Sequence, residues 1–277
     1  MADCESGQAK AIKALNLTVG WGPKSCLEQV AIELGSGSIL VIAGPNGAGK
    51  STLIKAIARQ LKPQSGQVLL DQTDIWTLSP KEYARQVAYV PQALEPGQDL
   101  TVEELVMLGR NPHQSWWSWS ASQEDRQAAR CALEKTETWN LRAQYLSSLS
   151  GGERQRAIIA MALAQEPRFL LMDEPTSHLD FRHQIELAEI LEELRSQGLG
   201  IALVLHDLNL MARLADHVLL ISKDGNAVSR VESQGPPSSV LEPATLRRTY
   251  QVEVSIIVDP RSGEKLFAPS RSIGPDS

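Results

Sequence analysis

Short runs of consecutive apolar residues recur along the chain and alternate with segments whose apolar residues follow helical spacing. Runs of this length are typical of buried strands. The apolar runs are Ile39–Ala43, Phe169–Met172 and Ile201–Leu205, and the helical segments place apolar side chains at Leu53, Ile54, Ile57 and Leu61 and at Ile158, Ile159, Met161 and Leu163. The alternation predicts an α/β fold with its strands in the interior.

A glycine-rich segment joins the first apolar run to the first helical segment. It fits the G-x-x-x-x-G-K-S/T pattern of a phosphate-binding loop, and its residues are Gly44, Pro45, Asn46, Gly47, Ala48, Gly49, Lys50, Ser51 and Thr52. Glycines let backbone amides approach phosphates, and the helix start adds its positive dipole end. Lys50 can bridge the β- and γ-phosphates, and Ser51 can hold Mg²⁺. A chance glycine-rich turn is the alternative, but the strand-loop-helix context favours nucleotide binding.

Two carboxylates follow the second apolar run. Asp173 and Glu174 stand directly after Phe169–Met172, at the carboxyl end of a strand, where α/β sheets bind ligands. Phosphoryl transfer mainly requires positioning and charge neutralisation. Asp173 would therefore assist Mg²⁺ coordination through water, and Glu174 would orient or deprotonate the attacking water. Taken alone, the segment could equally be an Asp-Glu-Pro surface turn.

Composition narrows the class of protein. The 277 residues, 42% of them hydrophobic, suffice for one large α/β domain or two modest ones. No stretch approaches the ~20 apolar residues of a membrane span, and the N-terminal residues lack the pattern of a signal peptide. The net charge of -6, without a Lys/Arg run, disfavours nucleic acid as a partner. We therefore expect a cytosolic protein that binds no nucleic acid.

The segment Leu149–Glu153 opens the helix that precedes the second apolar run. Ser150 and Glu153 fit a capping box, which by itself would explain both residues. It does not explain Gly151 and Gly152, because each glycine is less favourable than alanine in a helix by about 1 kcal/mol. Bare amides at a helix start indicate contact with a phosphate.

Together these motifs resemble the nucleotide-binding subunit of ATP-binding cassette (ABC) transporters. Leu149–Glu153 matches the signature sequence of that family, and the resemblance spans nearly the whole chain. In the family, the signature contacts the γ-phosphate held by the other subunit of a head-to-tail pair. The resemblance thus implies that two copies of the chain enclose two ATP molecules, with Ser150, Gly151 and Gly152 of each copy completing the site of the other.

Four more positions match the family in order. Gln92 matches the glutamine that senses Mg²⁺ and the attacking water, and Ser177–Asp180 resembles the D-loop, in which Asp180 lies at the dimer interface. His206 matches the switch histidine near the γ-phosphate; the alternative is a strand-boundary residue. Trp21 occupies the adenine-stacking position, where tyrosine is more usual in the family, with a packing role as the alternative.

The pattern divides one ABC domain into parts. Residues 1–91 and 150–225 should form the ATPase core, with an antiparallel β edge in its first part, and residues 92–149 an inserted helical subdomain. Residues 226–277 should form a C-terminal extension whose last part, Ala268–Ser277, is rich in proline, serine and glycine and expected to be mobile. In the insert, Trp116, Trp117 and Trp119 either pack locally or form a docking groove for a membrane subunit.

Three segments resemble one subgroup, the importers of iron-siderophores, haem or cobalamin. They are Leu108–His113, His178–Gln184 and Val204–Leu210. The resemblance implies an ATPase bound to two transmembrane permease subunits at the cytoplasmic face of the inner membrane, served indirectly by a substrate-binding protein. A soluble ABC ATPase of iron-sulfur cluster assembly, acting on partners outside the membrane, is the alternative.

Overall fold

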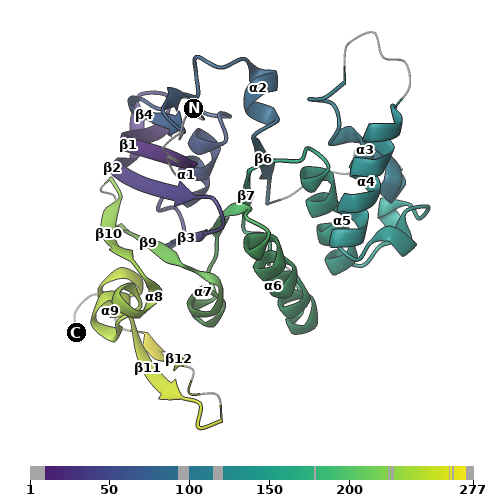
Figure 1. The fold of residues 1–277 in the computed structure, drawn as a ribbon. Helices are drawn as coiled ribbons and strands as arrows, with labels where there is room; N and C mark the ends of the chain where they lie inside the picture. Colours follow the sequence, from purple (N-terminus) through teal and green to yellow (C-terminus); the bar gives the residue numbers. More distant parts are fainter. Residues whose placement is uncertain are drawn as a thin grey trace, which may run out of the picture.

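A six-stranded sheet forms the centre of the protein, shown by a computed structural model (Figure 1). The structure describes residues 10–92, 100–114, 121–177, 179–223, 225, 228–261, 263 and 265–272. In the order β10-β9-β3-β8-β7-β6, the last five strands run parallel and only β10 is antiparallel to its neighbour. The strands are β3 (Ile39–Ala43), β6 (Val87–Val90), β7 (Phe169–Asp173), β8 (Gly200–Val204), β9 (His217–Ser222) and β10 (Arg230–Gly235).

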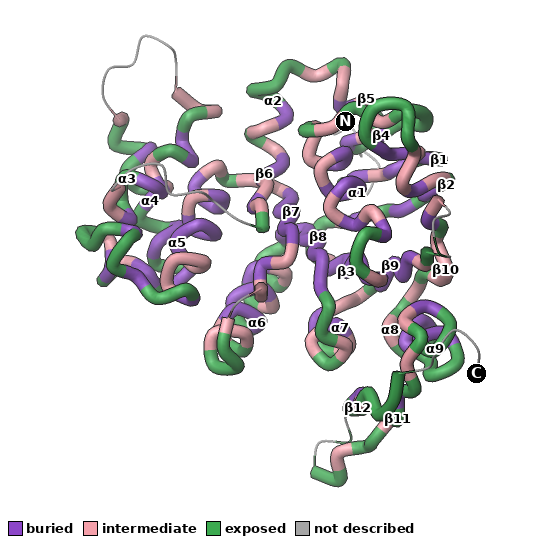
Figure 2. The backbone as a smooth tube through the Cα atoms, turned by 180° about the vertical axis from the view of Figure 1, so that it is seen from behind, coloured by how far each residue is buried: buried purple, intermediate pink, exposed green. Residues whose placement is uncertain are grey.

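The central strands are apolar throughout because both faces of the sheet are covered. Leu40 and Ile42 of β3 point into one hydrophobic core, and Ile39 and Val41 point into another on the opposite face. This alternation follows from the two-residue period of a strand. Figure 2 shows the central strands as almost continuously buried. The predicted α/β class is therefore confirmed.

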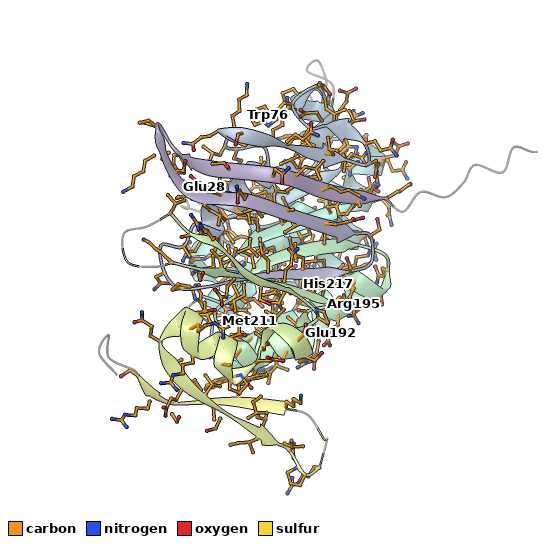
Figure 3. The ribbon with its side chains drawn as sticks, turned by 90° about the vertical axis from the view of Figure 1, so that its left-hand side faces the viewer. Glu28, Trp76, Glu192, Arg195, Met211 and His217 are labelled. Atoms are coloured by element: carbon orange, nitrogen blue, oxygen red, sulfur yellow. The ribbon has the colours of Figure 1, made fainter. Side chains whose placement is uncertain are left out.

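A second, antiparallel sheet covers one face of the first. Its order is β2-β1-β4-β5, and helix α1 packs against β1 on one side and against β7 and β8 on the other. Figure 3 shows the layers edge-on, with Trp76 beside the antiparallel strands and Met211 towards the C-terminal elements. The bounds are β1 (Ala11–Trp21), β2 (Lys24–Gly35), β4 (Ser65–Leu70), β5 (Thr73–Asp74), α1 (Lys50–Ile57) and α2 (Pro80–Ala84).

The described residues between β6 and β7 form helices, which stand beside the sheet as a separate lobe (Figure 1). Ser150 and Glu153 form the expected capping box at the start of α5, and Thr101 and Glu104 form another at the start of α3. Helices α3, α4 and α5 pack on one another. Their bounds are α3 (Val102–Leu108), α4 (Gln123–Lys135) and α5 (Gly151–Leu163), with 3-10 turns at Trp139–Leu141 and Leu146–Ser148.

A buried arginine fastens these helices together. Arg110, only 4% exposed, donates to Asp125 Oδ1 at 2.9 Å and to the Ala164 carbonyl at 2.6 Å. Asp125 also accepts from Ser122 as part of the cap of α4. Burial alone would raise the pKa of Asp125, but the hydrogen bonds from Arg110 and Ser122 outweigh it and lower the pKa. One guanidinium therefore joins the ends of α3 and α5 to the start of α4.

Helices α6 to α9 and a C-terminal hairpin pack on the face of the main sheet opposite the antiparallel sheet. The hairpin strands pair over their whole length, with Ile256 opposite Phe267. The expected mobile tail begins at Ala268, but residues 268–272 belong to β12 and pair with β11. The elements are α6 (Phe181–Ser196), α7 (Leu208–Leu214), α8 (Pro237–Val240), α9 (Pro243–Tyr250), β11 (Val252–Val258) and β12 (Lys265–Ser272).

Two other expectations concern the three tryptophans of the insert and membrane-spanning segments. Trp116, Trp117 and Trp119 lie outside the described residues. None of the helices in the described part of the chain is both long and apolar enough to pass through a bilayer.

The Arg110 network gives a stability prediction. Replacing Arg110 with leucine should lower the free energy of unfolding by about 3 to 5 kcal/mol, because Asp125 keeps its buried charge without a cation. Urea unfolding of the full chain measures the loss. The double variant Arg110→Leu/Asp125→Asn removes the charge as well and should recover much of the stability. Equal stability of the two variants would show that the ion pair does not hold the helices.

Candidate active site

Four neighbouring strands bring the predicted chemical residues to one edge of the main sheet. The strands β3, β8, β7 and β6 run parallel, so their carboxyl ends lie on the same side. The phosphate loop follows β3, Gln92 follows β6, and His206 follows β8. Asp173 is the last residue of β7, and Glu174 comes directly after it. Segments far apart in the sequence therefore meet at the edge where ligands bind in open α/β sheets.

The phosphate loop wraps around its own lysine. Lys50 is 5% exposed, and its Nζ donates to the carbonyls of Gly44 at 2.9 Å and Pro45 at 3.0 Å. Burial lowers the pKa of Lys50, while the nearby Glu174 and Asp173 carboxylates oppose that shift. A side chain at Gly44 would lie 2.4 Å from the Ile221 carbonyl oxygen, and the φ of 145° there also requires glycine. The loop thus presents a buried cation and backbone amides at the start of α1.

The Ser51 hydroxyl and the Asp173 carboxylate lie together near the lysine. The Ser51 hydroxyl donates to Asp173 Oδ1 at 2.8 Å, and the carboxylate is buried. Burial raises the pKa of Asp173, and the hydrogen bond from Ser51 opposes this. Hydroxyl and carboxylate oxygens are the donors that Mg²⁺ takes alongside phosphate and water. Accordingly, the described residues contain no group of three or more His, Cys, Asp or Glu side chains that would hold a metal by themselves.

Glu174 is held by three side chains from separate segments. Its Oε2 accepts from Gln92 Nε2 at 2.7 Å and from the Ser177 hydroxyl at 3.1 Å, and its Oε1 lies 2.8 Å from His206 Nε2. The backbone φ of 49° at Glu174 is in the left-handed region, which a non-glycine residue adopts at a cost. The turn and the three partners together fix the direction of this carboxylate.

These partners also keep Glu174 ionised. Burial alone would raise the pKa of Glu174, but the hydrogen bonds from His206 and Ser177 outweigh it and leave the pKa below its ordinary value. An ionised carboxylate only accepts hydrogen bonds, so the His206 Nε2 facing it carries a proton. Glu174 is therefore a fixed, ionised carboxylate near the buried Lys50.

The remaining predicted residues lie apart from this cluster. Within the described ranges, no hydrogen bond or ion pair joins Ser150, Gly151 or Trp21 to the Glu174 cluster. Ser150 and Gly151 begin α5 in the helical lobe (Figure 1). Asp180 caps α6 by accepting from the His183 amide at 2.9 Å. Trp21 ends β1 with 61% of its surface exposed, so packing does not occupy the indole. One copy of the chain thus brings together only part of the predicted site.

Gly152 has a packing role that its sequence position did not reveal. A side chain there would lie 2.3 Å from the ring of His183 on α6. The His183 ring in turn lies 3.0 Å from Glu186, which also pairs with Arg156 of α5. Hydrogen bonds from His183 and, to a smaller extent, from Arg182 lower the pKa of Glu186 to about 2. The start of α5 is therefore locked to the helix that follows the D-loop.

Two of these contacts were not predicted from the sequence. Ser177 had been placed in the D-loop, but its bond to Glu174 was not foreseen; its position three residues after Glu174, as in a turn, was the available signal. For His183 no local signal exists, because its contact with Gly152 joins two helices that are separated in the chain.

Comparisons with known proteins identify the family of this chain. The family model described as ABC transporter matches residues 27–177. The chain is 38% identical to the petrobactin import ATP-binding protein FpuD of Bacillus anthracis, over 94% of this chain and 93% of that protein. It is 39% identical to the ferric enterobactin transport ATP-binding protein FepC of Escherichia coli (strain K12), over 96% of each.

Solved structures show the same fold. A transporter assigned to the metal-chelate type of ABC transporters, in an inward-facing conformation, aligns with a TM-score of 0.82 at 26% identity, covering 95% of this chain and 98% of that chain. A nucleotide-free ATP-binding cassette of an ABC transporter aligns with a TM-score of 0.75 at 25% identity, covering 86% and 97%.

The Gly152 contact can be tested without nucleotide. Replacing Gly152 with alanine should lower the free energy of unfolding by about 1 to 3 kcal/mol, because the new methyl group must displace the His183 ring. Gly151, the exposed neighbour in the same helical turn, is the matched control, and alanine there should be neutral or stabilising by up to about 1 kcal/mol. Urea unfolding compares the two, and equal effects would contradict the packing role.

Proposed function

This chain belongs to the ABC transporter family, and we propose that it is the ATP-hydrolysing subunit that powers an importer of an iron complex, such as a siderophore or haem, or of cobalamin. The observation that carries the ATPase proposal is the Glu174 carboxylate, held by Gln92, Ser177 and His206 beside the phosphate loop. The import assignment is supported by relatives whose names describe transport of petrobactin and enterobactin.

ATP would bind with its phosphates in the glycine loop. The backbone N–H groups of the loop, which every residue from Gly44 to Thr52 except Pro45 carries, and the Lys50 ammonium would donate to the phosphate oxygens. Lys50 would then exchange its bonds to the Gly44 and Pro45 carbonyls for bonds to the β- and γ-phosphates. Ser51 and Asp173, with Gln92, would hold Mg²⁺, which neutralises phosphate charge when bound. The exposed indole of Trp21 would stack on the adenine ring.

Hydrolysis would depend on the carboxylate of Glu174. Held ionised at a fixed angle, it would orient the attacking water and take its proton. His206, with a proton on Nε2, would stabilise the charge that develops on the γ-phosphate, and Gln92 would exchange its bond to Glu174 for one to the water. His206 and Gln92 would thus pass from holding the base to holding the reacting groups.

A second copy of the chain would complete each site. Ser150, Gly151 and Gly152 lie on the helical lobe, apart from Lys50 of the same copy, so a twofold pair would bring them to the γ-phosphate of the partner. Asp180 would lie at that interface. Closing and reopening of the pair would then move the helical lobes.

The relatives that serve importers support the following assembly. Residues 1–91 and 150–225 would act as the ATPase core and 226–277 as an extension. The moving helical subdomain, predicted as 92–149, would also include α5, because α5 packs on α3 and α4. The pair would bind two membrane permease subunits, receive substrate indirectly from a binding protein, and lie peripherally at the cytoplasmic face of the inner membrane. Iron-sulfur cluster assembly with soluble partners remains the second candidate, because it would use the same ATPase site.

Glu174 gives the test of the chemistry. Glu174→Gln should lower the rate of ATP hydrolysis by about 10²- to 10⁴-fold, because an amide cannot take a proton from water, while ATP binding is retained and the ATP-bound dimer accumulates. Phosphate release and size-exclusion chromatography measure the two effects. Glu189→Gln, an exposed position on α6, is the matched control. Near-normal hydrolysis in Glu174→Gln would remove Glu174 from the role of base.

The partner decides between the two candidate functions. When the tagged chain is purified from its own cells after gentle solubilisation of membranes, a polytopic membrane protein should co-purify, as identified by mass spectrometry. Recovery only from the soluble fraction, together with cluster-assembly proteins, would leave the ATPase proposal intact and overturn the import proposal.

A further inference from the structure

Two hydrogen-bonded contacts join the segment of His206 and Asn209 to residues that are distant in the sequence. One is the contact between His206 and Glu174 in the active site. The other starts three residues later, at Asn209 in the first turn of α7, and reaches Phe267 on the C-terminal hairpin. The first turn of α7 is itself closed by Asp207, which accepts from the Leu210 amide at 2.7 Å. His206 and Asn209 therefore lie at the start of one rigid turn.

The amide of Asn209 bonds to both backbone polar groups of one residue. Its Oδ1 accepts from the Phe267 N–H at 2.7 Å, and its Nδ2 donates to the Phe267 carbonyl at 3.3 Å. Phe267 lies opposite Ile256 in the hairpin, and alternate residues of an antiparallel strand direct both groups away from the partner strand. The side chain of Asn209 thus takes the place of a neighbouring strand at the open edge of β12.

The hairpin is anchored firmly enough to act as a support. The side chains of Phe267 and Val254 are buried in the same core as Met211 and Leu214 of α7. Just before β11, the Tyr250 hydroxyl is buried and finds no hydrogen-bond partner among the described residues. Burial raises the pKa of Tyr250 to about 12, and the nearby Gly44 amide opposes that shift. The C-terminal extension therefore contacts the segment that carries His206 and Asn209 and also lies near Gly44, the first residue of the phosphate loop.

Packing alone does not fix His206 against the extension. An open pocket of about 340 Å³ lies between them and is lined by His206, Asn209, Tyr250 and Phe267, among others. The His206 side chain itself is 42% exposed. The two hydrogen bonds of Asn209 therefore join α7 to the hairpin beside this open pocket.

We propose that Asn209 is a positioning residue for ATP hydrolysis, and that its link to Phe267 makes the C-terminal hairpin the support that holds His206 at Glu174 and, in the closed dimer, at the γ-phosphate. This inference rests on the proposed ATPase function and extends it to a part of the chain that no step of the hydrolysis uses directly. Asn209 acts through the α7 turn and does not touch the nucleotide.

The test compares three substitutions in the purified full chain with Mg-ATP. Asn209→Ala removes both bonds to Phe267, and Asn209→Asp keeps the acceptor of the 2.7 Å bond but loses the donor. Ser270→Ala is the matched control, because the Ser270 hydroxyl bonds to the Glu253 carbonyl within the hairpin and does not reach α7. We expect kcat to fall by about 10- to 100-fold in Asn209→Ala, since small displacements of catalytic groups cost this much. KM and ATP affinity should stay unchanged, Asn209→Asp should be intermediate, and Ser270→Ala should match the parent.

A second measurement needs no turnover. Hydrogen exchange of the backbone amides in residues 206–211 should become faster in Asn209→Ala and stay unchanged in Ser270→Ala, in the nucleotide-free protein. If the parent chain itself hydrolyses no ATP, the proposed function fails while this measurement still decides whether the link exists. Unchanged exchange in Asn209→Ala would overturn the link. A parent-like kcat in Asn209→Ala, or equal losses of kcat, ATP binding and thermal stability, would overturn the positioning role.

Discussion

The site depends on one constraint, which is that parallel neighbouring strands end on the same edge of a sheet. Because β3, β8, β7 and β6 are adjacent and parallel, the segments that follow them have to meet there. Each parallel pair needs a crossover connection, and these connections carry the helices that cover both faces. The same arrangement therefore builds the two cores and collects the charged groups at one edge.

At that edge, each buried charge lies near a charge of opposite sign, which offsets part of the cost of burying it. Burial disfavours the charged forms of both Lys50 and Asp173, and each of them favours the charged form of the other. Glu174 is held differently, because hydrogen bonds from His206 and Ser177 outweigh the effect of burial on its pKa. A buried cation, a buried carboxylate and a second, ionised carboxylate can then coexist within one network.

The helical lobe and the C-terminal extension relate to this network in different ways. The lobe is locked to α6 at Gly152, where the His183 ring leaves no room for a side chain, so the signature residues lie on a rigid element with the D-loop at its side. The extension reaches the network from the other direction, through Asn209 and Phe267. The ATPase core thus contacts the helical lobe at Gly152, a residue of the proposed dimer interface. It contacts the C-terminal extension at Asn209, near the His206 proposed to act in hydrolysis.

The sequence by itself determined the fold class, the phosphate loop, the two carboxylates and the capping boxes, because each of these is written in neighbouring residues. A glycine loop between an apolar run and a helical pattern, or Ser150 three residues before Glu153, needs no distant partner to be recognised. Only the tertiary structure decided that Ser177 would hold Glu174, that His183 would pack on Gly152, and that residues 268–272 would belong to β12 and pair with β11. These contacts join residues on different elements, and their geometry is set by the packing of helices and strands, which no local pattern records.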